Sequence, residues 1–292
     1  HDQGIDIQRR ITGGGAIYFD EGQLGWELHL DRDALGTSDM QDITRRVCET
    51  AAQGISALGL DARFRPRNDI EVDGRKISGT GGVFEGHSFL YQGTLLLVFD
   101  TERMLRVLRI PAEKLSNKAI QSARERVTDL RELLGQVPPL EEVKSRLAQA
   151  FSEAFSIDLE TEGELNDAER RHYVQALREI DSPDWVYENR RPETDAPILD
   201  GLHRADGGLI RASVAFDRKR NLIKQVWISG DFFVEPKRLI ADLEAVLKDT
   251  PRAALYERVE TFFAHNEGAP LMLGHRDFAQ AIANAVETAD AT

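Results

Sequence analysis

The sequence predicts an α/β protein, with a mixed α/β domain over residues 1–180 and a smaller α+β domain over residues 201–292, joined by a linker at residues 181–200. Between residues 16 and 100, runs of alternating or continuous apolar residues are typical of strands. From residue 116 to residue 180, apolar residues recur at helical spacing instead. Extended runs and helical patterns occur again beyond the linker. The linker itself contains three prolines and several charges without periodicity.

The strands of the first domain are predicted from the spacing of their apolar residues. Residues 16–19 form a short apolar run, and residues 26–30 alternate apolar with polar side chains, which is the period of a half-buried strand. Residues 93–100 are apolar on both faces. This pattern favours a buried strand in the centre of a sheet.

A β-hairpin is predicted around Asp73-Gly74, because an Asp-Gly pair between two extended runs is a strong hairpin signal. The arms are the four residues before and the four residues after this turn. With a two-residue turn, Glu71 lies opposite Lys76. Lys76 then shares a face of the sheet with Glu71 and Asp69.

Helices are predicted from apolar residues three and four positions apart. In the first helix, Ser38 and Gln41 are spaced as a capping box, and the apolar positions continue to Gly59. Asn166 and Glu169 are spaced in the same way at the start of a later helix. The remaining helical patterns span residues 116–135, 140–155, 166–180, 236–249, 251–265 and 275–288. A second hairpin is predicted from residues 209–216 and 222–228.

The composition narrows the classes of protein. Of the 292 residues 41% are hydrophobic and 30% charged, which is typical of a soluble globular chain. No apolar run approaches the roughly 20 residues of a spanning helix, so we expect no membrane segment. The net charge of -13 argues against a nucleic-acid partner. The single cysteine excludes a disulfide framework and suits the cytoplasm. Because the chain begins at His1 without methionine, no targeting peptide is inferred.

A glycine-rich motif, Arg-Arg-Ile-Thr-Gly-Gly-Gly-Ala, spans residues 9–16. Three consecutive glycines leave backbone without side chains, so a ligand can approach the amides closely. The two preceding arginines add permanent charges that can hold an anion. A flexible loop is the alternative interpretation. The arginines before the glycines and the strand after them favour an anion-binding site.

Lys76 is the second candidate. A lysine amid carboxylates also fits a solvated sheet face, but the adjoining residues 78–82 (Ser-Gly-Thr-Gly-Gly) again offer bare backbone to a ligand. Three arginines at alternate positions would project from one face of an extended segment, where either solvent or a bound anion offsets their repulsion. The proline among them suggests an edge or irregular segment, which suits solvent. These residues are Arg63, Arg65 and Arg67.

Cys48 lies within the first amphipathic helix, with no histidine at helical spacing on its face. We therefore interpret it as a buried packing residue and not as a nucleophile.

These motifs resemble those of the lipoate–protein ligases, a family of the wider biotin and lipoate ligase superfamily. Residues 9–20 resemble the family's Arg-Arg-x-x-Gly-Gly-Gly signature, residues 68–79 its second signature and residues 93–96 its third. Residues 182–185 and 230–233 are similar to parts of the family's carboxy-terminal accessory domain. The resemblance implies a mixed β-sheet catalytic domain of the biotin/lipoate ligase type followed by a second, smaller α+β domain.

Two differences from the family pattern bear on the site. The family's catalytic domain starts several strands earlier, so we expect the N-terminal part of the lipoate pocket to be missing from this chain. Phe19 stands where the family usually has a histidine before the aspartate of the first motif.

The resemblance implies an ATP-dependent ligase that converts lipoate to lipoyl-AMP and transfers the lipoyl group to a lysine of an acceptor protein. The implied cofactors are ATP, lipoate and Mg²⁺. The implied acceptor is the E2 protein of a 2-oxoacid dehydrogenase, the glycine cleavage H protein or a dedicated lipoate-binding protein.

By this resemblance, Lys76 is the catalytic residue and touches both the lipoate carboxylate and the α-phosphate. Contacts with ATP or lipoyl-AMP are implied for Arg10, Gly15, Ala16, Ile17, Tyr18, Asn68 and Asp69. Contacts with lipoate are implied for Gly13, Gly14 and Gly79. No metal ligand is assigned.

Two alternatives remain open. An octanoyl or lipoyl transferase of the same superfamily that forms an acyl-enzyme needs a cysteine nucleophile, and Cys48 is poorly placed for that role. The other alternative is a lipoate-binding homologue without catalytic activity, against which the presence of Lys76 argues.

Overall fold

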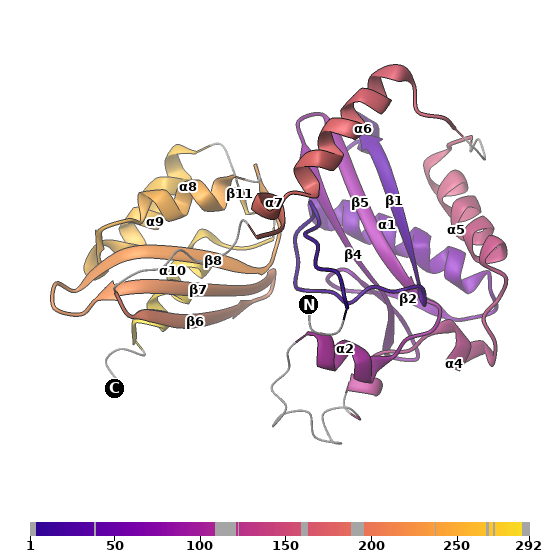
Figure 1. Ribbon diagram of the computed structural model, residues 1–292, viewed down its shortest axis with the longest axis horizontal. Coiled ribbons are helices and arrows are strands. Elements are labelled where there is room, and N and C mark those ends of the chain that lie inside the picture. The colour runs from indigo at the N-terminus through magenta and orange to yellow at the C-terminus, as the bar shows by residue number, and fades with distance from the viewer. Residues whose placement is uncertain are drawn as a thin grey trace.

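Two main β-sheets, each with its own hydrophobic core, organise the chain in this computed structural model (Figure 1). The structure describes residues 4–37, 39–108, 121, 123–158, 163–187, 196–236, 238–266, 269–270 and 272–287. The mixed α/β architecture predicted from the sequence is confirmed. No described helix has both the length and the apolar character needed to cross a bilayer.

The first sheet has five strands in the order β1-β5-β4-β3-β2, and all neighbouring strands pair antiparallel. One face packs against helix α1, and α5 packs on α1 (Figure 1). Strand β5 lies between β1 and β4, so the interior position predicted for the apolar run is confirmed, but the strand ends at Leu96 and residues 97–100 lie outside it. The bounds of these elements are β1 Gln23–Asp31, α1 Met40–Ser56, β2 Ala62–Arg65, β3 Asp69–Val72, β4 Arg75–Glu85, β5 Ser88–Leu96 and α5 Leu140–Phe155.

The hairpin of β3 and β4 has the predicted two-residue turn. Asp73 and Gly74 both have positive φ, 50° and 75°, a conformation that matches the right-handed twist of the flanking strands. Glu71 lies opposite Lys76, as predicted. A register shift follows between Ile70 and Glu71.

Two helix predictions need correction. The cap of α1 is Asp39, whose side chain accepts from the amides of Gln41 and Asp42; Ser38, the predicted cap, lies outside the described residues. The pattern at 116–135 is not one helix in its described part. Val127 forms a bridge with Lys76, and only then does α4 (Leu130–Leu134) begin. A helix cannot continue through Asp129, because the backbone of this residue is extended and its side chain caps the N-terminus of α4.

Three further helices lie between residues 101 and 187. They are α2 (Thr101–Val107), α6 (Asp167–Ile180) and α7 (Pro183–Tyr187), and the short 3-10 helix η1 (Asp33–Leu35) follows β1. The capping box predicted for Asn166 and Glu169 is confirmed at the start of α6. Helix α7 and the first residues of β6 lie within the range assigned to the linker, 181–200.

The second sheet has four strands in the order β10-β8-β7-β6, with helix α10 packed on β6 and β7. The predicted hairpin is confirmed in β7 and β8. The bounds are β6 Ile198–Ala205, β7 Gly208–Asp217, β8 Leu222–Asp231, α8 Leu239–Val246, β10 Thr250–Pro251, η3 Arg252–Ala254, α9 Leu255–His265 and α10 His275–Glu287. The short strands β9 (Val234–Glu235) and β11 (Ala269–Pro270) form a third pair.

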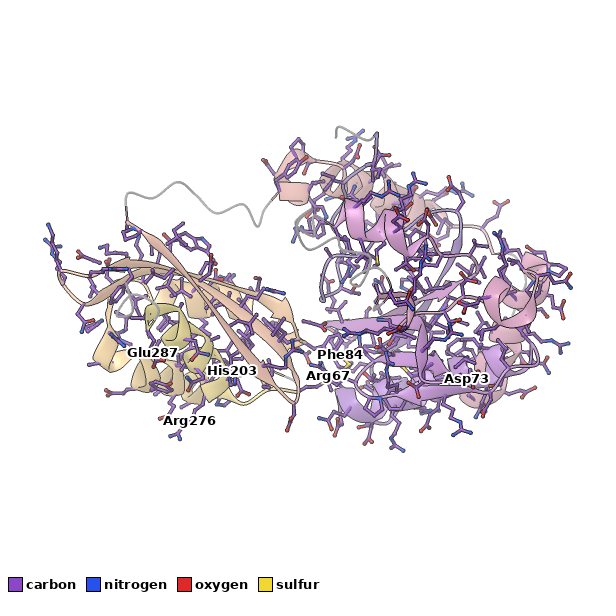
Figure 2. All side chains as sticks on the ribbon, turned by 90° about the horizontal axis from the view of Figure 1, so that it is seen from below. Arg67, Asp73, Phe84, His203, Arg276 and Glu287 are labelled. Carbon is purple, nitrogen blue, oxygen red and sulfur yellow. The ribbon has the colours of Figure 1, made fainter. Side chains whose placement is uncertain are left out.

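We call the first sheet with its packed helices the first unit and the second sheet with its packed helices the second unit. The two units contact one another through the segment that follows β8. Arg32 pairs with Glu235 of β9 at 2.5 Å, and its guanidinium lies 4.5 Å from the centre of the Phe84 ring. Figure 2 places Phe84 and Arg67 on the side of the first unit that is turned toward the second, and Asp73 on the far side.

Candidate functional site

The face of the first sheet that points away from α1 carries a strip of bare backbone. Gly25, Thr94, Gly79 and Asp69 lie opposite one another on β1, β5, β4 and β3. Residues opposite one another in a sheet share a face. Because two of the four are glycines, only Thr94 and Asp69 contribute side chains of their own to this row. We call these four residues the glycine row.

Lys76 reaches over one end of the glycine row. Its Nζ lies 2.6 Å from Asp69 Oδ1, so the prediction that Lys76 and Asp69 share a face is confirmed. A Cβ atom on Gly79 would lie only 2.7 Å from Nζ, and therefore only glycine leaves room for the ammonium there. The backbone of Lys76 is held on its other side, since its amide donates to Arg126 and its carbonyl accepts from Thr128.

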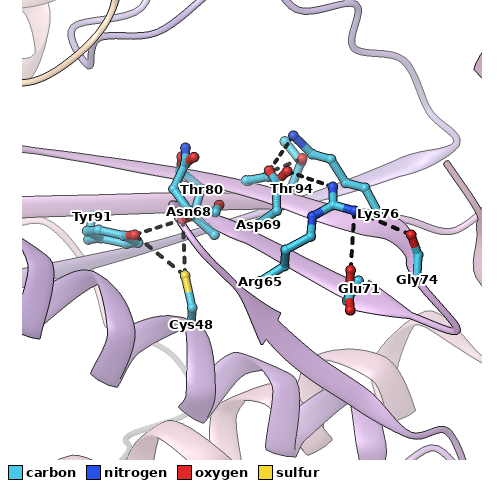
Figure 3. A network of polar contacts seen from close by, with 11 residues as sticks. Cys48, Arg65, Asn68, Asp69, Glu71, Gly74, Lys76, Thr80, Tyr91 and Thr94 are labelled. Carbon is cyan, nitrogen blue, oxygen red and sulfur yellow. Dashed lines mark hydrogen bonds and ion pairs between the residues drawn. The ribbon is translucent and has the colours of Figure 1, made fainter. Parts of the chain in front are cut away.

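The partners of Lys76 form an ion network at the edge of the sheet (Figure 3). Arg65 donates to Asp69 Oδ2 at 2.9 Å and to Glu71 Oε2 at 3.2 Å. The hydrogen bond to Asp69 is the main reason why the pKa of Arg65 is raised. Arg63 pairs instead with Asp61. These partners belong to the chain itself and satisfy both arginines, so the external anion considered for this segment finds no support at Arg63 or Arg65.

Asn68, the residue before Asp69, is hydrogen-bonded to Thr80 of β4. The side-chain amide of Asn68 donates to the backbone carbonyl of Thr80 at 2.6 Å, and the backbone carbonyl of Asn68 accepts from the Thr80 hydroxyl at 2.9 Å. The same hydroxyl lies 2.7 Å from the Tyr91 hydroxyl and 3.3 Å from Cys48 Sγ in the core (Figure 3). Burial raises the pKa of the Cys48 thiol, and Cys48 is fully buried, so its predicted packing role is confirmed.

The glycine-rich motif folds around Arg10. Its guanidinium donates to the carbonyls of Gly13 and Gly15, both at 2.8 Å. Burial lowers the pKa of Arg10, while the nearby carboxylate of Asp231 opposes that shift. The guanidinium stays charged and shapes the loop. A Cβ on Gly13 would lie 3.1 Å from the Phe232 carbonyl, so the loop also approaches the second unit closely.

The continuation of the motif lies along the open face of the sheet. Thr12 is buried and accepts from Gln92 of β5 at 2.8 Å. Ala16 and Ile17 are exposed. Tyr18 is buried and donates to Asp20, and burial together with this hydrogen bond raises the pKa of Tyr18 to about 12. The Phe19 ring lies 3.4 Å from the Cβ position of Gly25. The motif therefore reaches one end of the glycine row, and Lys76 lies at the other.

Three residues beyond position 180 also contact these motifs and were not identified in the sequence. Trp185 stacks on Arg9, Asp231 lies beside Gly14 and Arg10, and Phe233 lies 3.9 Å from the Cβ position of Gly81. All three lie within stretches noted as similar to the accessory domain, but no spacing signal links any of them to residues so distant along the chain.

Chemically, the site joins a half-exposed ammonium, a bare strip of backbone and a loop shaped by an arginine. Lys76 is 38% exposed at its side chain, so an anion can reach it. Among the described residues, no group of three His, Cys, Asp or Glu side chains is placed to hold a metal ion. The arrangement fits an organic anion better than a protein-bound cation.

Comparisons with known proteins identify the family of the chain. Residues 1–152 match a family model described as the lipoyl protein ligase A/B catalytic domain. Lipoate–protein ligase 1 of Staphylococcus aureus is 30% identical over 230 residues, which cover 78% of this chain and 66% of that protein. Octanoyltransferase LipM of Kyrpidia tusciae is 26% identical over 208 residues, covering 63% and 75%. The chain spans about two thirds of the length of the first of these relatives.

Two solved structures share the fold. The bipartite lipoate protein ligase of Thermoplasma acidophilum, described with its E2 lipoyl domain, superposes with a TM-score of 0.59 at 28% identity, covering 66% of this chain and 74% of that one. A lipoate-protein ligase A bound with ATP has a TM-score of 0.54 at 26% identity, covering 63% and 73%.

Proposed function

Because the chain belongs to the lipoate–protein ligase family of enzymes, within the biotin/lipoate ligase superfamily, we propose that it activates lipoate with ATP and transfers the lipoyl group to a lysine of an acceptor protein. The observation that carries this proposal is the Lys76 ammonium above Gly79, on the sheet face along which the glycine-rich motif lies.

The first step joins two anions. A carboxylate oxygen of lipoate attacks the α-phosphorus of ATP, the bond to the β-phosphate oxygen breaks, and pyrophosphate leaves with its electron pair. Negative charge accumulates between the two reactants as they approach. The Lys76 ammonium offsets that charge, and its position over Gly79 requires no reorganisation at the moment of reaction.

The second step transfers the acyl group. The neutral amine of the acceptor lysine attacks the carbonyl carbon of lipoyl-AMP, the bond to the phosphate oxygen breaks, and AMP leaves. Water must be excluded until then, because the mixed anhydride hydrolyses. The contacts of Phe233 and of the Phe232 carbonyl with the glycine motifs make the second unit a candidate for this closure.

The remaining site residues take these proposed roles. Arg10 holds the loop in shape through the carbonyls of Gly13 and Gly15. In this proposal Arg10 and the backbone of Gly15, Ala16, Ile17 and Tyr18 border the nucleotide. Gly13, Gly14 and Gly79 border the lipoyl group, and the missing side chain of Gly79 leaves the room that the Lys76 ammonium occupies. Asp69 orients Lys76. Asn68, which is tied to Thr80 of β4, and Asp69 border the nucleotide beside it.

Mg²⁺ would enter with the nucleotide. The described residues offer no set of three ligands for it, which fits a cation held mainly by phosphates and water. The proposed acceptor is a lipoyl-domain protein, supported by the E2 lipoyl domain described with the Thermoplasma relative. We place the reaction in the cytoplasm, in keeping with a single, buried cysteine.

An octanoyltransferase is the second candidate, supported by the similarity to LipM. If such an enzyme forms an acyl-enzyme it needs an accessible thiolate. Cys48 is fully buried and its pKa is raised. We therefore favour the ligase.

The test is pyrophosphate release with ATP and lipoate, followed by weighing a lipoyl-domain acceptor. Lys76→Ala should lower the rate by about a hundredfold to a thousandfold, since one well-placed donor contributes roughly 3–4 kcal/mol to the transition state. Lys76→Arg should recover little, because a planar fork does not replace a compact ammonium. Lys144→Ala, which removes a surface lysine from α5, is the matched control. A folded Lys76→Ala protein within a few-fold of the parent, or equal transfer without ATP, would contradict the proposal.

A further inference from the structure

Arg65 is a charged residue near the site to which the proposed chemistry gives no role. It lies on β2, the strand next to β3, directly opposite Asp69. Its two terminal nitrogens reach two different carboxylates, Asp69 at 2.9 Å and Glu71 at 3.2 Å, and one of them also lies 3.4 Å from the carbonyl of Gly74. The guanidinium is therefore held at three points.

The Asp69 carboxylate is shared between two cations. Oδ2 accepts from Arg65, while Oδ1 lies 2.6 Å from the Lys76 ammonium (Figure 3). The exposed fractions of the Arg65 and Asp69 side chains are 35% and 22%, so the pair is only partly screened by solvent. A pair in this setting interacts more strongly than one on the open surface.

The charges of this network balance. Arg65 and Lys76 are cationic, and Asp69 and Glu71 are anionic, so the four side chains carry no net charge together. Without Arg65 the network is left with one excess negative charge. That charge would lie where a carboxylate and a phosphate must approach, and Asp69 would compete with both for the ammonium.

We propose that Arg65 is a positioning residue for Lys76: it shares the Asp69 carboxylate, so that Asp69 orients the ammonium without cancelling its charge toward the substrates. This proposal rests on the proposed function of Lys76. Arg65 itself touches no reacting atom and acts through Asp69.

Arg63 provides a matched control. It lies on the same strand with the same charge, but its hydrogen bonds go to the exposed Asp61. Of the four network residues it lies opposite Glu71, whereas Arg65 lies opposite Asp69. Arg65→Met should lower kcat for pyrophosphate release by about tenfold, with KM for ATP and for lipoate changed by less than about threefold. Arg63→Met should stay within about twofold in kcat. Equal losses in the two variants, or a loss confined to KM, would overturn the proposal.

A double-mutant cycle tests whether Arg65 acts through Asp69. In an Asp69→Asn background, adding Arg65→Met should cost less than about twofold more, because the shared carboxylate is already gone. Arg65→Lys should recover part of kcat, since an ammonium can still share Asp69 but cannot also hold Glu71 and Gly74. A full, independent tenfold loss in the double variant would show that Arg65 acts by another route.

A readout without catalysis separates this proposal from the proposed function. Trace acetylation of the free protein with acetic anhydride, followed by peptide mass analysis, measures the reactivity of the Lys76 amine. Asp69→Asn should accelerate labelling of Lys76. Arg65→Met should slow it by at least about threefold, because Asp69 then pairs with Lys76 alone, and Arg63→Met should leave it unchanged.

Thermal melts confirm folding of each variant. A parent protein that releases no pyrophosphate would contradict the proposed function, and the labelling result would still decide the pairing. Identical Lys76 labelling in Arg65→Met and the parent would overturn the positioning role.

Discussion

The side chain of Trp185 is fastened to Arg9, the first residue of the glycine-rich motif. The indole nitrogen donates to the Arg9 carbonyl at 2.9 Å, Arg9 Nε donates to the Trp185 carbonyl at 2.6 Å, and the guanidinium lies 3.9 Å from the centre of the indole ring. Residues 176 positions apart thus hold one another. Helix α7 thereby fixes the start of the loop that Arg10 shapes.

We expect Trp185→Ala to raise KM for ATP about thirtyfold, because a stacked cation and a hydrogen bond together contribute on the order of 2 kcal/mol and 1.4 kcal/mol corresponds to a factor of ten. Trp185→Phe should show a smaller increase, since it keeps a ring but loses the indole donor. Tyr173→Ala on α6, which removes an exposed aromatic side chain, is the control. Unchanged KM in Trp185→Ala would separate α7 from nucleotide binding.

Gly93, the first residue of the third motif, serves packing. A Cβ there would lie 2.2 Å from Trp26 Cζ2, and the Trp26 ring is itself enclosed by Phe151 at 5.2 Å and Tyr91 at 6.4 Å between ring centres. The indole has no room to move. Gly93→Ala should therefore lower the free energy of unfolding by about 2–3 kcal/mol, the cost of overpacking a core.

Urea denaturation measures this loss. Gly163→Ala is the control, because a Cβ at Gly163 would meet nothing within 4 Å, and its unfolding free energy should change by less than about 0.5 kcal/mol. Equal stability of Gly93→Ala and the parent would mean that the Trp26 ring does not lie over Gly93 in solution.

Cys48→Ser should leave turnover within about twofold of the parent. The thiol is fully buried and lies 3.3 Å from the Thr80 hydroxyl, so a serine hydroxyl has a hydrogen-bond partner in place and costs little more than about 1 kcal/mol of stability. Pyrophosphate release and acceptor modification measure turnover. Loss of transfer in a folded Cys48→Ser protein would revive the acyl-enzyme alternative.

The ion pair between Arg32 and Glu235 joins the two units. With 28% and 25% of their side chains exposed, the two residues are partly shielded from solvent, and Arg32 also stacks on Phe84. We expect the second unit to move relative to the first when a stable adenylate analogue binds. Small-angle scattering should differ with and without the analogue.

Arg32→Met should make the unliganded profile more extended, because the contact that holds the second unit is lost. Arg276→Met, which breaks an exposed pair within the second unit, should not change it. Identical profiles for all three proteins, with and without the analogue, would argue against closure.

The spacing of residues along the sequence was sufficient to predict the structure where the stabilising interactions join residues only a few positions apart. The Asp73-Gly74 turn places Glu71 opposite Lys76, and with it the shared face of Lys76 and Asp69. The register shift beyond Glu71, which puts Asp69 opposite Gly79, was not predicted. The capping box at Asn166 works across three residues in the same way. The helix predicted through residues 126–128 was wrong, because its apolar spacing does not record that Val127 pairs with Lys76, far away along the chain.

By itself, the sequence determined most of the strands and helices, the β3–β4 hairpin, the burial of Cys48 and the two glycine-rich motifs, because turn chemistry and periodicity act over a few residues. The strand predicted from the apolar run at residues 16–19 is not formed. Only the tertiary structure decided which charges meet. Arg65 joins Asp69 and Glu71 while Arg63, two residues away, pairs with Asp61. It also decided that Trp185 holds Arg9. Such pairings depend on strand order and helix packing, which bring distant segments to one place and are not encoded in any local spacing.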